Sequence, residues 1–164
     1  MTDGTLHVYT WRDGLLSKLG HDLRLRVEPF EVVRDGAQLT ASCRADAVRL
    51  ESAMVGGVPT AGLLSDKDTR DIHKNLDRDV LQGGKYPIIR YVGRVEGDRL
   101  VGDLELTGKA RRLEIPLTRE GGRLRGQVEF APSLWGIKPF KALLGALRIQ
   151  DRVQVRFDLP EHEA

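Results

Sequence analysis

Apolar and polar side chains alternate along the last part of the chain, from residue 147 to residue 159. Successive side chains of a β-strand point to opposite faces, so the pattern predicts a strand with one apolar face and one wet, largely basic face. The apolar face consists of Leu147, Ile149, Val153, Val155, Phe157 and Leu159. The opposite face consists of Arg148, Gln150, Arg152, Gln154, Arg156 and Asp158.

Shorter patterns of the same kind predict strands over most of the chain, joined by glycine-containing turns. Pro29 is expected to mark a bend within one of them, because proline cannot donate to a ladder. The segments 38–43 and 45–51 are expected to be two parts of one long bent strand. Turns are expected at Asp35-Gly36, Gly97-Asp98, Gly108-Lys109 and Gly121-Gly122. The other predicted strands are 6–11, 22–33, 88–95, 99–107, 111–119 and 123–131.

One principal helix is predicted near the middle of the chain. Ser65 can cap its first turn together with Asp68, and a stripe of Ile72, Leu76 and Val80 can face the strands. The pair Gly83-Gly84 is expected to end this helix. The glycine-rich segment 52–64 is predicted to be a loop, and the segment 139–147 is predicted to form an amphipathic helical turn.

About eight antiparallel strands and one helix in 164 residues predict a single, mainly β domain over residues 1–164. Such strands close into a barrel or pack as a sandwich. A small barrel can hold one apolar ligand.

Composition excludes several classes of protein. The net charge is only +2, and basic residues are interleaved with acidic ones, which argues against a nucleic-acid partner. Cys43 is the single cysteine and lies on an apolar alternation, so a buried inert thiol is expected and an internal disulfide is excluded. The first residues lack the features of a secretory signal, and no apolar run is long enough for a transmembrane segment. A cytoplasmic location is therefore expected.

The sequence carries no motif of a catalytic, metal or cofactor site. There is no His-x-x-x-His or Cys-x-x-Cys spacing, no Gly-x-Ser-x-Gly and no phosphate loop. The expectation is a protein that is not an enzyme and needs neither a metal nor a cofactor. His21 is expected either to contact a ligand head group at a barrel mouth or to bond a backbone carbonyl. His73 is expected either to face the opening or to be a hydrogen-bonded helix residue.

Two groups of apolar residues fall in the predicted connections between strands, where they can either plug the barrel or line its opening. The residues are Trp11, Leu15, Leu16 and Leu19 in the first group, and Trp135, Phe140, Leu143 and Leu144 in the second. With His21 and His73 they form the predicted ligand-binding set. Arg70, Lys85 and Lys138 are candidate partners for an anionic head group.

Several short motifs, in order along nearly the whole chain, resemble the YceI-like family. They are GHD at 20–22, DKDTRDIHKNL at 66–76, GKYPIIRY at 84–91, GDLELTGKARRLEIPL at 102–117, LWGI at 134–137, LG at 144–145 and IQDRV at 149–153. The resemblance implies an antiparallel lipocalin-like β-barrel with a long internal tunnel, which in characterised relatives holds polyisoprenoid chains or similar amphiphilic lipids. The sequence departs from the family pattern in two ways. Many relatives are periplasmic, whereas the first residues here lack the features of a secretory signal. The stretch 54–64, beside one barrel mouth, is longer than usual.

The leading expectation is therefore that the barrel binds, and carries or sequesters, an isoprenoid or another amphipathic lipid. One alternative is a small-molecule enzyme that uses a cavity histidine, either His21 with Asp22 or His73. Another is a ligand-free interaction module whose basic face (Arg148, Arg152 and Arg156) meets an acidic partner. The oligomeric state stays open, with a homodimer among the alternatives.

Overall fold

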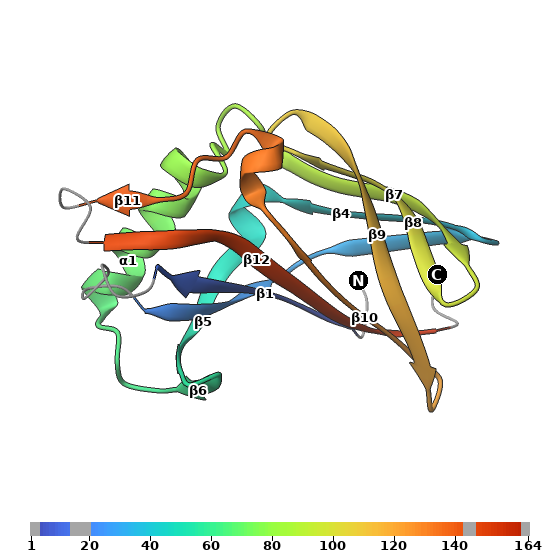
Figure 1. The fold of residues 1–164 in the computed structure, drawn as a ribbon, viewed down its shortest axis with the longest axis horizontal. Helices are drawn as coiled ribbons and strands as arrows, with labels where there is room; N and C mark the ends of the chain where they lie inside the picture. The colour runs from blue at the N-terminus through green and yellow to red at the C-terminus, as the bar shows by residue number, and fades with distance from the viewer. Residues whose placement is uncertain (1–3, 14–20, 143–146, 162–164) are drawn as a thin grey trace.

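The computed structural model describes residues 4–13, 21–142 and 147–161, which form an antiparallel sheet that curls into a barrel (Figure 1). The helical elements are η1 (Ala45–Ala47), α1 (Asp66–Asn75), a π-helical turn η2 (Leu76–Val80) and η3 (Pro132–Trp135). The strands are β1 (Thr5–Arg12), β2 (Asp22–Val27), β3 (Glu31–Asp35), β4 (Gln38–Arg44), β5 (Val48–Val55), β6 (Val58–Thr60), β7 (Ile88–Glu96), β8 (Arg99–Leu106), β9 (Lys109–Glu120), β10 (Arg123–Phe130), β11 (Lys141–Ala142) and β12 (Leu147–Pro160).

Two bent strands close the barrel. The hydrogen-bonded path runs β3-β4-β7-β8-β9-β10-β12-β1-β2-β5-β6. The chain continues from β2 into β3 through a bend at Pro29, and from β4 into β5 through η1, with Glu28 N–H donating to Ala47 O across the two bends. Because these connections join the two ends of the path, the sheet returns on itself. Counting each bent pair as one strand, and setting aside the short β6 and β11, leaves the eight strands that the sequence predicts.

Two sequence predictions about the connections are wrong. The segment 52–64 is not all loop, because β5 extends to Val55 and pairs with β6 around Gly56 and Gly57, whose positive φ angles of 57° and 80° suit a tight hairpin turn. The segment 139–147 does not form a helical turn where the structure describes it. Lys141 and Ala142 instead pair with Arg148 and Leu147 as antiparallel strands.

The helix α1 begins as its sequence predicts. Ser65 Oγ accepts the N–H of Asp68, and the Asp68 carboxylate accepts the N–H of Ser65, which forms a capping box. The helical path continues through η2 and ends when Gln82 adopts a positive φ of 50°, one residue before the predicted Gly83-Gly84 stop. In Figure 1 this helix lies at one end of the barrel, beside β11 and the start of β12. No helix within the described ranges is long and apolar enough to cross a membrane.

The barrel interior contains two clusters of buried apolar side chains. The first lies under α1 and η2 and includes Leu25, Val48, Leu81 and Trp135. The second lies toward the opposite end, among β4, β7, β8, β9 and β10. Its members are Leu39, Tyr91, Leu100, Ile115, Leu117 and Leu124.

Candidate ligand-binding cavity

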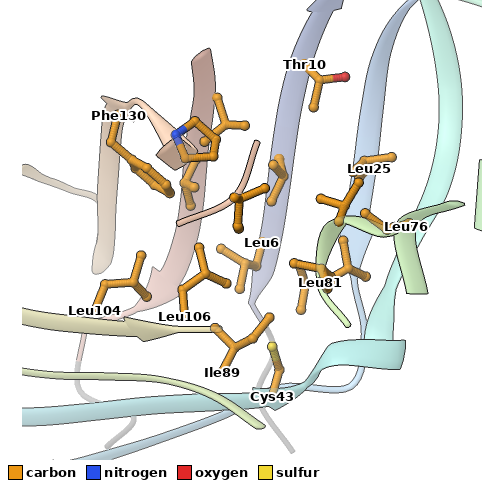
Figure 2. Close-up of a pocket in the computed structure, with 18 of the residues that line it drawn as sticks. Leu6, Thr10, Leu25, Cys43, Leu76, Leu81, Ile89, Leu104, Leu106 and Phe130 are labelled. Atoms are coloured by element: carbon orange, nitrogen blue, oxygen red, sulfur yellow. The ribbon is translucent and has the colours of Figure 1, made fainter. Parts of the chain in front are cut away.

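A cavity of about 630 Å³ occupies the part of the barrel that α1 covers. This volume lies within the range of pockets that enclose small organic ligands, roughly 300–1,000 Å³. Its walls come from the inward faces of strands all around the barrel and from the inner side of α1 and η2. Figure 2 shows apolar side chains from these elements pointing toward the same space, among them Leu6, Leu25, Leu81, Ile89 and Leu104.

The walls are apolar because each strand places alternate residues inside. On β12, Val153, Val155, Phe157 and Leu159 line the cavity, as the alternation along this segment predicts. The same holds for Leu6 and Val8 on β1. The apolar face predicted for this strand is therefore confirmed from Val153 to Leu159 and meets the cavity. The face predicted to be wet is not wet throughout, because Gln150 also lines the cavity and Gln154 is buried.

Most polar lining residues gather at one mouth of the cavity, and Ser42 on β4, Asn75 at the end of α1 and Tyr91 on β7 are further polar lining residues. This mouth is built from the end of β1, the start of β2 and β12, the first turns of α1 and the connection after η3. Its polar members are Thr10, His21, Asp68, Asp71, Lys138, Gln150 and Asp151. A ligand with a long apolar body and one polar end matches this distribution.

The carboxylates at the mouth are held in place by local partners. Hydrogen bonds from the backbone and side chain of Ser65 keep the pKa of Asp68 below its usual range. Asp71 pairs with Lys67 at 3.0 Å between Nζ and Oδ2. Asp151 accepts the N–H of Ser133 at 3.0 Å, which ties the start of β12 to η3.

Tyr91 lines the cavity where the cavity meets the second apolar cluster. The side chain is 7% exposed and belongs both to the cavity lining and to the second apolar cluster. Its hydroxyl donates to Leu113 O at 2.7 Å, from β7 to β9. Burial raises the pKa of Tyr91 to about 12, with a further contribution from the charge of Asp103. The hydroxyl therefore remains protonated and available as a donor.

Cys43 is a lining residue with a suppressed acidity. Burial, and secondarily the charge of Asp46, raises the pKa of its thiol to about 11. Nucleophilic reaction of a cysteine requires the thiolate, so Cys43 is a poor nucleophile at neutral pH. This supports the interpretation of the residue as an inert thiol.

The structure brings only part of the predicted ligand-binding set to the cavity. His21 and Phe140 line it near the mouth. Leu15, Leu16, Leu19, Leu143 and Leu144 lie outside the described residues. Trp11, His73 and Trp135 do not line the cavity, and their roles as ligand contacts stay predictions.

The three residues away from the cavity have other contacts. The ring of Trp11 lies under the Arg152 guanidinium at 3.8 Å. Trp135 is 2% exposed and donates its indole N–H to Leu104 O at 2.8 Å. His73 Nε2 accepts the N–H of Leu50 at 2.9 Å, and burial together with the nearby Arg49 lowers the pKa of His73.

Two of the groups considered for acid–base chemistry, Asp22 and His73, are engaged with the backbone. The Asp22 carboxylate accepts the N–H of Arg12 at 2.9 Å, at the entrance to β2. His73 accepts the Leu50 N–H, as described above. In the part of the chain that the structure describes, no three His, Cys, Asp or Glu side chains come together in a way that could hold a metal ion.

The basic side chains considered for partners lie in two different places. Of the three candidate partners for an anionic head group, only Lys138 lines the cavity, and Lys85 lies 5.3 Å from the Tyr86 ring instead. On the outer face of β12, Arg152 pairs with Glu129 at 2.6 Å and Arg156 covers the ring of Tyr9 at 4.3 Å.

Sequence reasoning missed two residues of the cavity lining. Tyr91 falls in a predicted strand, and its inward position follows from the alternation with Ile89, but nothing in the sequence shows that its hydroxyl reaches Leu113 O on β9. Asp151 is a polar residue within the alternating pattern of the last strand, and no neighbouring pattern distinguishes it from the other polar residues there. Its place at the mouth depends on which strand end faces α1, which is a property of the closed barrel.

The comparison with protein families gives one match over most of the chain. A family model described as the YceI-like domain matches residues 30–160. No curated protein gives a significant match.

Solved structures with the same fold cover nearly the whole chain at low sequence identity. BcnA of Burkholderia cenocepacia is 13% identical over 97% of this chain and 98% of its own, with a TM-score of 0.61. A polyisoprenoid-binding domain from Saccharophagus degradans, implicated in plant cell wall breakdown, is 12% identical over 96% of this chain and 92% of its own, also with a TM-score of 0.61. A variant of the CJ YceI protein is 12% identical over 84% of this chain and 82% of its own, with a TM-score of 0.55. At these identities the likeness shows the fold alone.

Proposed function

Because the chain belongs to the YceI-like family, we propose that its cavity binds an isoprenoid or another amphipathic lipid. The observation that carries this proposal is a 630 Å³ cavity with apolar walls whose polar lining lies mostly at one mouth. Each buried methylene contributes roughly 0.8 kcal/mol, so an enclosed tail can supply most of the affinity. The name of the Saccharophagus degradans domain, polyisoprenoid-binding, supports this choice of ligand class.

The charges at the mouth favour an uncharged head group. Among the lining residues that the structure describes, the three carboxylates of Asp68, Asp71 and Asp151 lie at the mouth with one lysine, Lys138. Two like charges 4 Å apart in water repel by about 1 kcal/mol, which is several-fold in affinity. A hydroxyl can accept from Lys138 and donate to a carboxylate, whereas a phosphate meets more negative than positive charge. We therefore expect an isoprenoid alcohol to bind more tightly than its phosphate.

The mechanism we propose is enclosure without covalent chemistry. The tail enters beside α1 and lies against the inward faces of the strands, while the head group stays among the polar residues of the mouth. Such a complex can carry or sequester its lipid, since the tail is withdrawn from water. The cytoplasmic location, the homodimer, the enzyme alternative and the interaction-module alternative stay predictions.

The test is native mass spectrometry of freshly purified protein, followed by organic extraction of any bound molecule. The expected result is an added mass that extracts as a long-chain lipid, or uptake of isoprenoid alcohols by the free protein. Ala41→Trp places a large side chain on the inner face of β4 and is expected to abolish uptake. Thr40→Trp, at the next position on the same strand and outside the lining, is the matched control and is expected to bind normally. A protein that neither contains nor takes up any lipid would contradict the proposal.

A further inference from the structure

We propose that the β5–β6 hairpin, with the segment that leads from it to α1, docks the protein on a lipid bilayer while the ligand enters or leaves the cavity. This inference rests on the proposed function, and it adds the surface from which the lipid is taken. The docking surface consists of the exposed apolar residues of this stretch, which are Val55, Val58, Pro59, Ala61 and Leu63.

The stretch that carries the docking surface has no charge. Residues 52–65 form a run of fourteen positions without Asp, Glu, Lys or Arg, in a chain of which 30% of the residues are charged. No other run without these four residues is as long in this sequence. Because a charge is costly to remove from water, an exposed segment that has none can enter the boundary between head groups and acyl chains at little cost.

The apolar side chains of the docking surface stand in solvent. Val55 is 57% exposed, Val58 is 61% exposed and Leu63 is 42% exposed. The tip of the hairpin is clear of the barrel, since no atom beyond the adjoining residues lies within 4 Å of the place that a Cβ would take at Gly56 or Gly57. In Figure 1, β6 correspondingly stands apart from the barrel wall.

The docking surface adjoins the mouth of the cavity on two sides. At the base of the hairpin, Met54 pairs with Asp22 at the start of β2, next to the lining residue His21. At the other end of the stretch, Leu64 lines the cavity, as does Asp68 in the first turn of α1. The hairpin therefore connects two elements that build the mouth, and a bilayer in contact with the docking surface lies beside the opening.

The ligand class favours a bilayer as the partner. Every methylene of a long-chain lipid adds to the free energy that keeps it in the membrane, so the lipid leaves the membrane for water only slowly. A protein that touches the bilayer spares the tail this passage through water. A second protein chain fits less well, because a stable protein interface takes roughly 20–30 residues on each side and the docking surface has five.

The charges beside the docking surface indicate a bilayer without net charge. The first turns of α1 carry three acidic and two basic side chains, which are Asp66, Lys67, Asp68, Arg70 and Asp71. This balance gives no attraction to anionic lipids, so burial of the apolar side chains has to supply the association. We therefore expect contact with phosphatidylcholine vesicles to be weak, insensitive to salt and not strengthened by anionic lipid.

The experiment follows the transfer of a fluorescent long-chain alcohol from the loaded protein to phosphatidylcholine vesicles that contain a quencher. Transfer by contact has a rate that rises with vesicle concentration, whereas release through water has a rate that does not. For the natural protein we expect a rate proportional to vesicle concentration at low and high salt. For the double variant Val55→Asp/Val58→Asp we expect a rate at least about tenfold lower, because two carboxylates would have to lose water at the bilayer surface.

The matched control is the double variant Val33→Asp/Val92→Asp. These valines are 61% and 41% exposed on β3 and β7, but charged residues such as Glu31 and Arg90 share the outer faces of their strands. We expect this variant to transfer the alcohol at the natural rate. The affinity for the same alcohol delivered from cyclodextrin should be equal in all three proteins, because none of the four valines lines the cavity.

The possible results separate the inference from the proposed function. A natural rate that does not depend on vesicle concentration, or a folded hairpin variant that transfers as fast as the natural protein, would overturn the inference while leaving lipid binding intact. If the double variant does not fold, Val58→Asp alone provides the same test with one charge. A natural dimer that the hairpin variant dissociates in sedimentation equilibrium would assign the surface to a second copy of the chain and also overturn the inference. Failure of the natural protein to bind the alcohol from cyclodextrin would instead contradict the proposed function, and the inference with it.

Discussion

Replacement of Trp135 by phenylalanine distinguishes a structural role of this residue from a role in ligand binding. Trp135 lies where β9 and β10 are not paired, and it connects the neighbouring elements. Its indole N–H donates to Leu104 O on β8 at 2.8 Å, and its carbonyl accepts from Thr107 Oγ1 in the β8–β9 turn at 2.7 Å. Its ring packs on Phe130 at the end of β10, with 4.8 Å between centroids.

The expected loss of stability follows from these contacts. The phenylalanine variant loses one buried hydrogen bond, worth about 0.5–1.5 kcal/mol net, together with part of a ring that is 2% exposed. A total of about 1–3 kcal/mol is expected, compared with about 3–5 kcal/mol for Trp135→Ala. For a chain of this size, each kcal/mol lowers the melting temperature by about 2–4 °C.

The assay is urea unfolding followed by far-ultraviolet circular dichroism, combined with lipid binding under native conditions. Trp11→Phe is the matched control, because that half-buried ring lies under the exposed Arg152 and such a surface contact contributes only about 0.5–1 kcal/mol. We expect Trp135→Phe to lose stability while its lipid affinity stays within about threefold of the natural protein. Unchanged stability with a tenfold loss of affinity would refute the reasoning and make Trp135 a ligand contact.

Three further outcomes follow from single residues. Gly102→Ala should unfold at much lower urea concentration, because its Cβ would lie 2.1 Å from Val92 O, whereas Gly84→Ala, with no atom within 4 Å, should be neutral; equal midpoints would contradict this. The pKa of His73 is lowered below 6.5 in the folded protein, so the unfolded state binds more protons and the stability of the fold should decrease as the pH drops below 6.5. In thermal melts at pH 5 to 8, His73→Gln should lose this dependence of stability on pH. An unchanged dependence would be evidence against the role of His73. With its pKa raised to about 11 from 9.0, Cys43 should react with iodoacetamide at pH 8 about a hundredfold more slowly than in urea-unfolded protein, and comparable rates would show that burial does not suppress the thiolate.

The alternation of side chains was enough to predict most of the fold. Val153, Val155 and Phe157 follow each other at two-residue spacing, and a strand has no other way to bury them on one side. The helix was predictable because Ser65 and Asp68 form a local capping box. Both features depend on residues that lie close together in the sequence, so they can be predicted from one sequence alone.

The failures concern connections that tertiary pairing decides. Phe140 and its apolar neighbours have helical spacing, but the Phe140 carbonyl accepts the N–H of Ile149, so the chain there is held against β12 in the described structure. The hairpin around Gly56 and Gly57 was not predicted, because other glycines and prolines in the same segment also indicate turns. The hydrogen bond from Tyr91 to Leu113 O was not predictable, because it joins two strands whose residues lie more than twenty positions apart in the sequence.

The filled end of the barrel has a consequence for how this protein can evolve or be redesigned. This end contains Leu117 and Leu124, which lie outside the cavity, so their packing does not depend on what the other end binds. Lining residues outside this cluster, such as Leu6 and Thr10, can change size without removing this support. Ligand preference and folding are then separable properties of one chain. A lineage could alter its cargo by substitutions in one half of the barrel while the other half preserves the architecture.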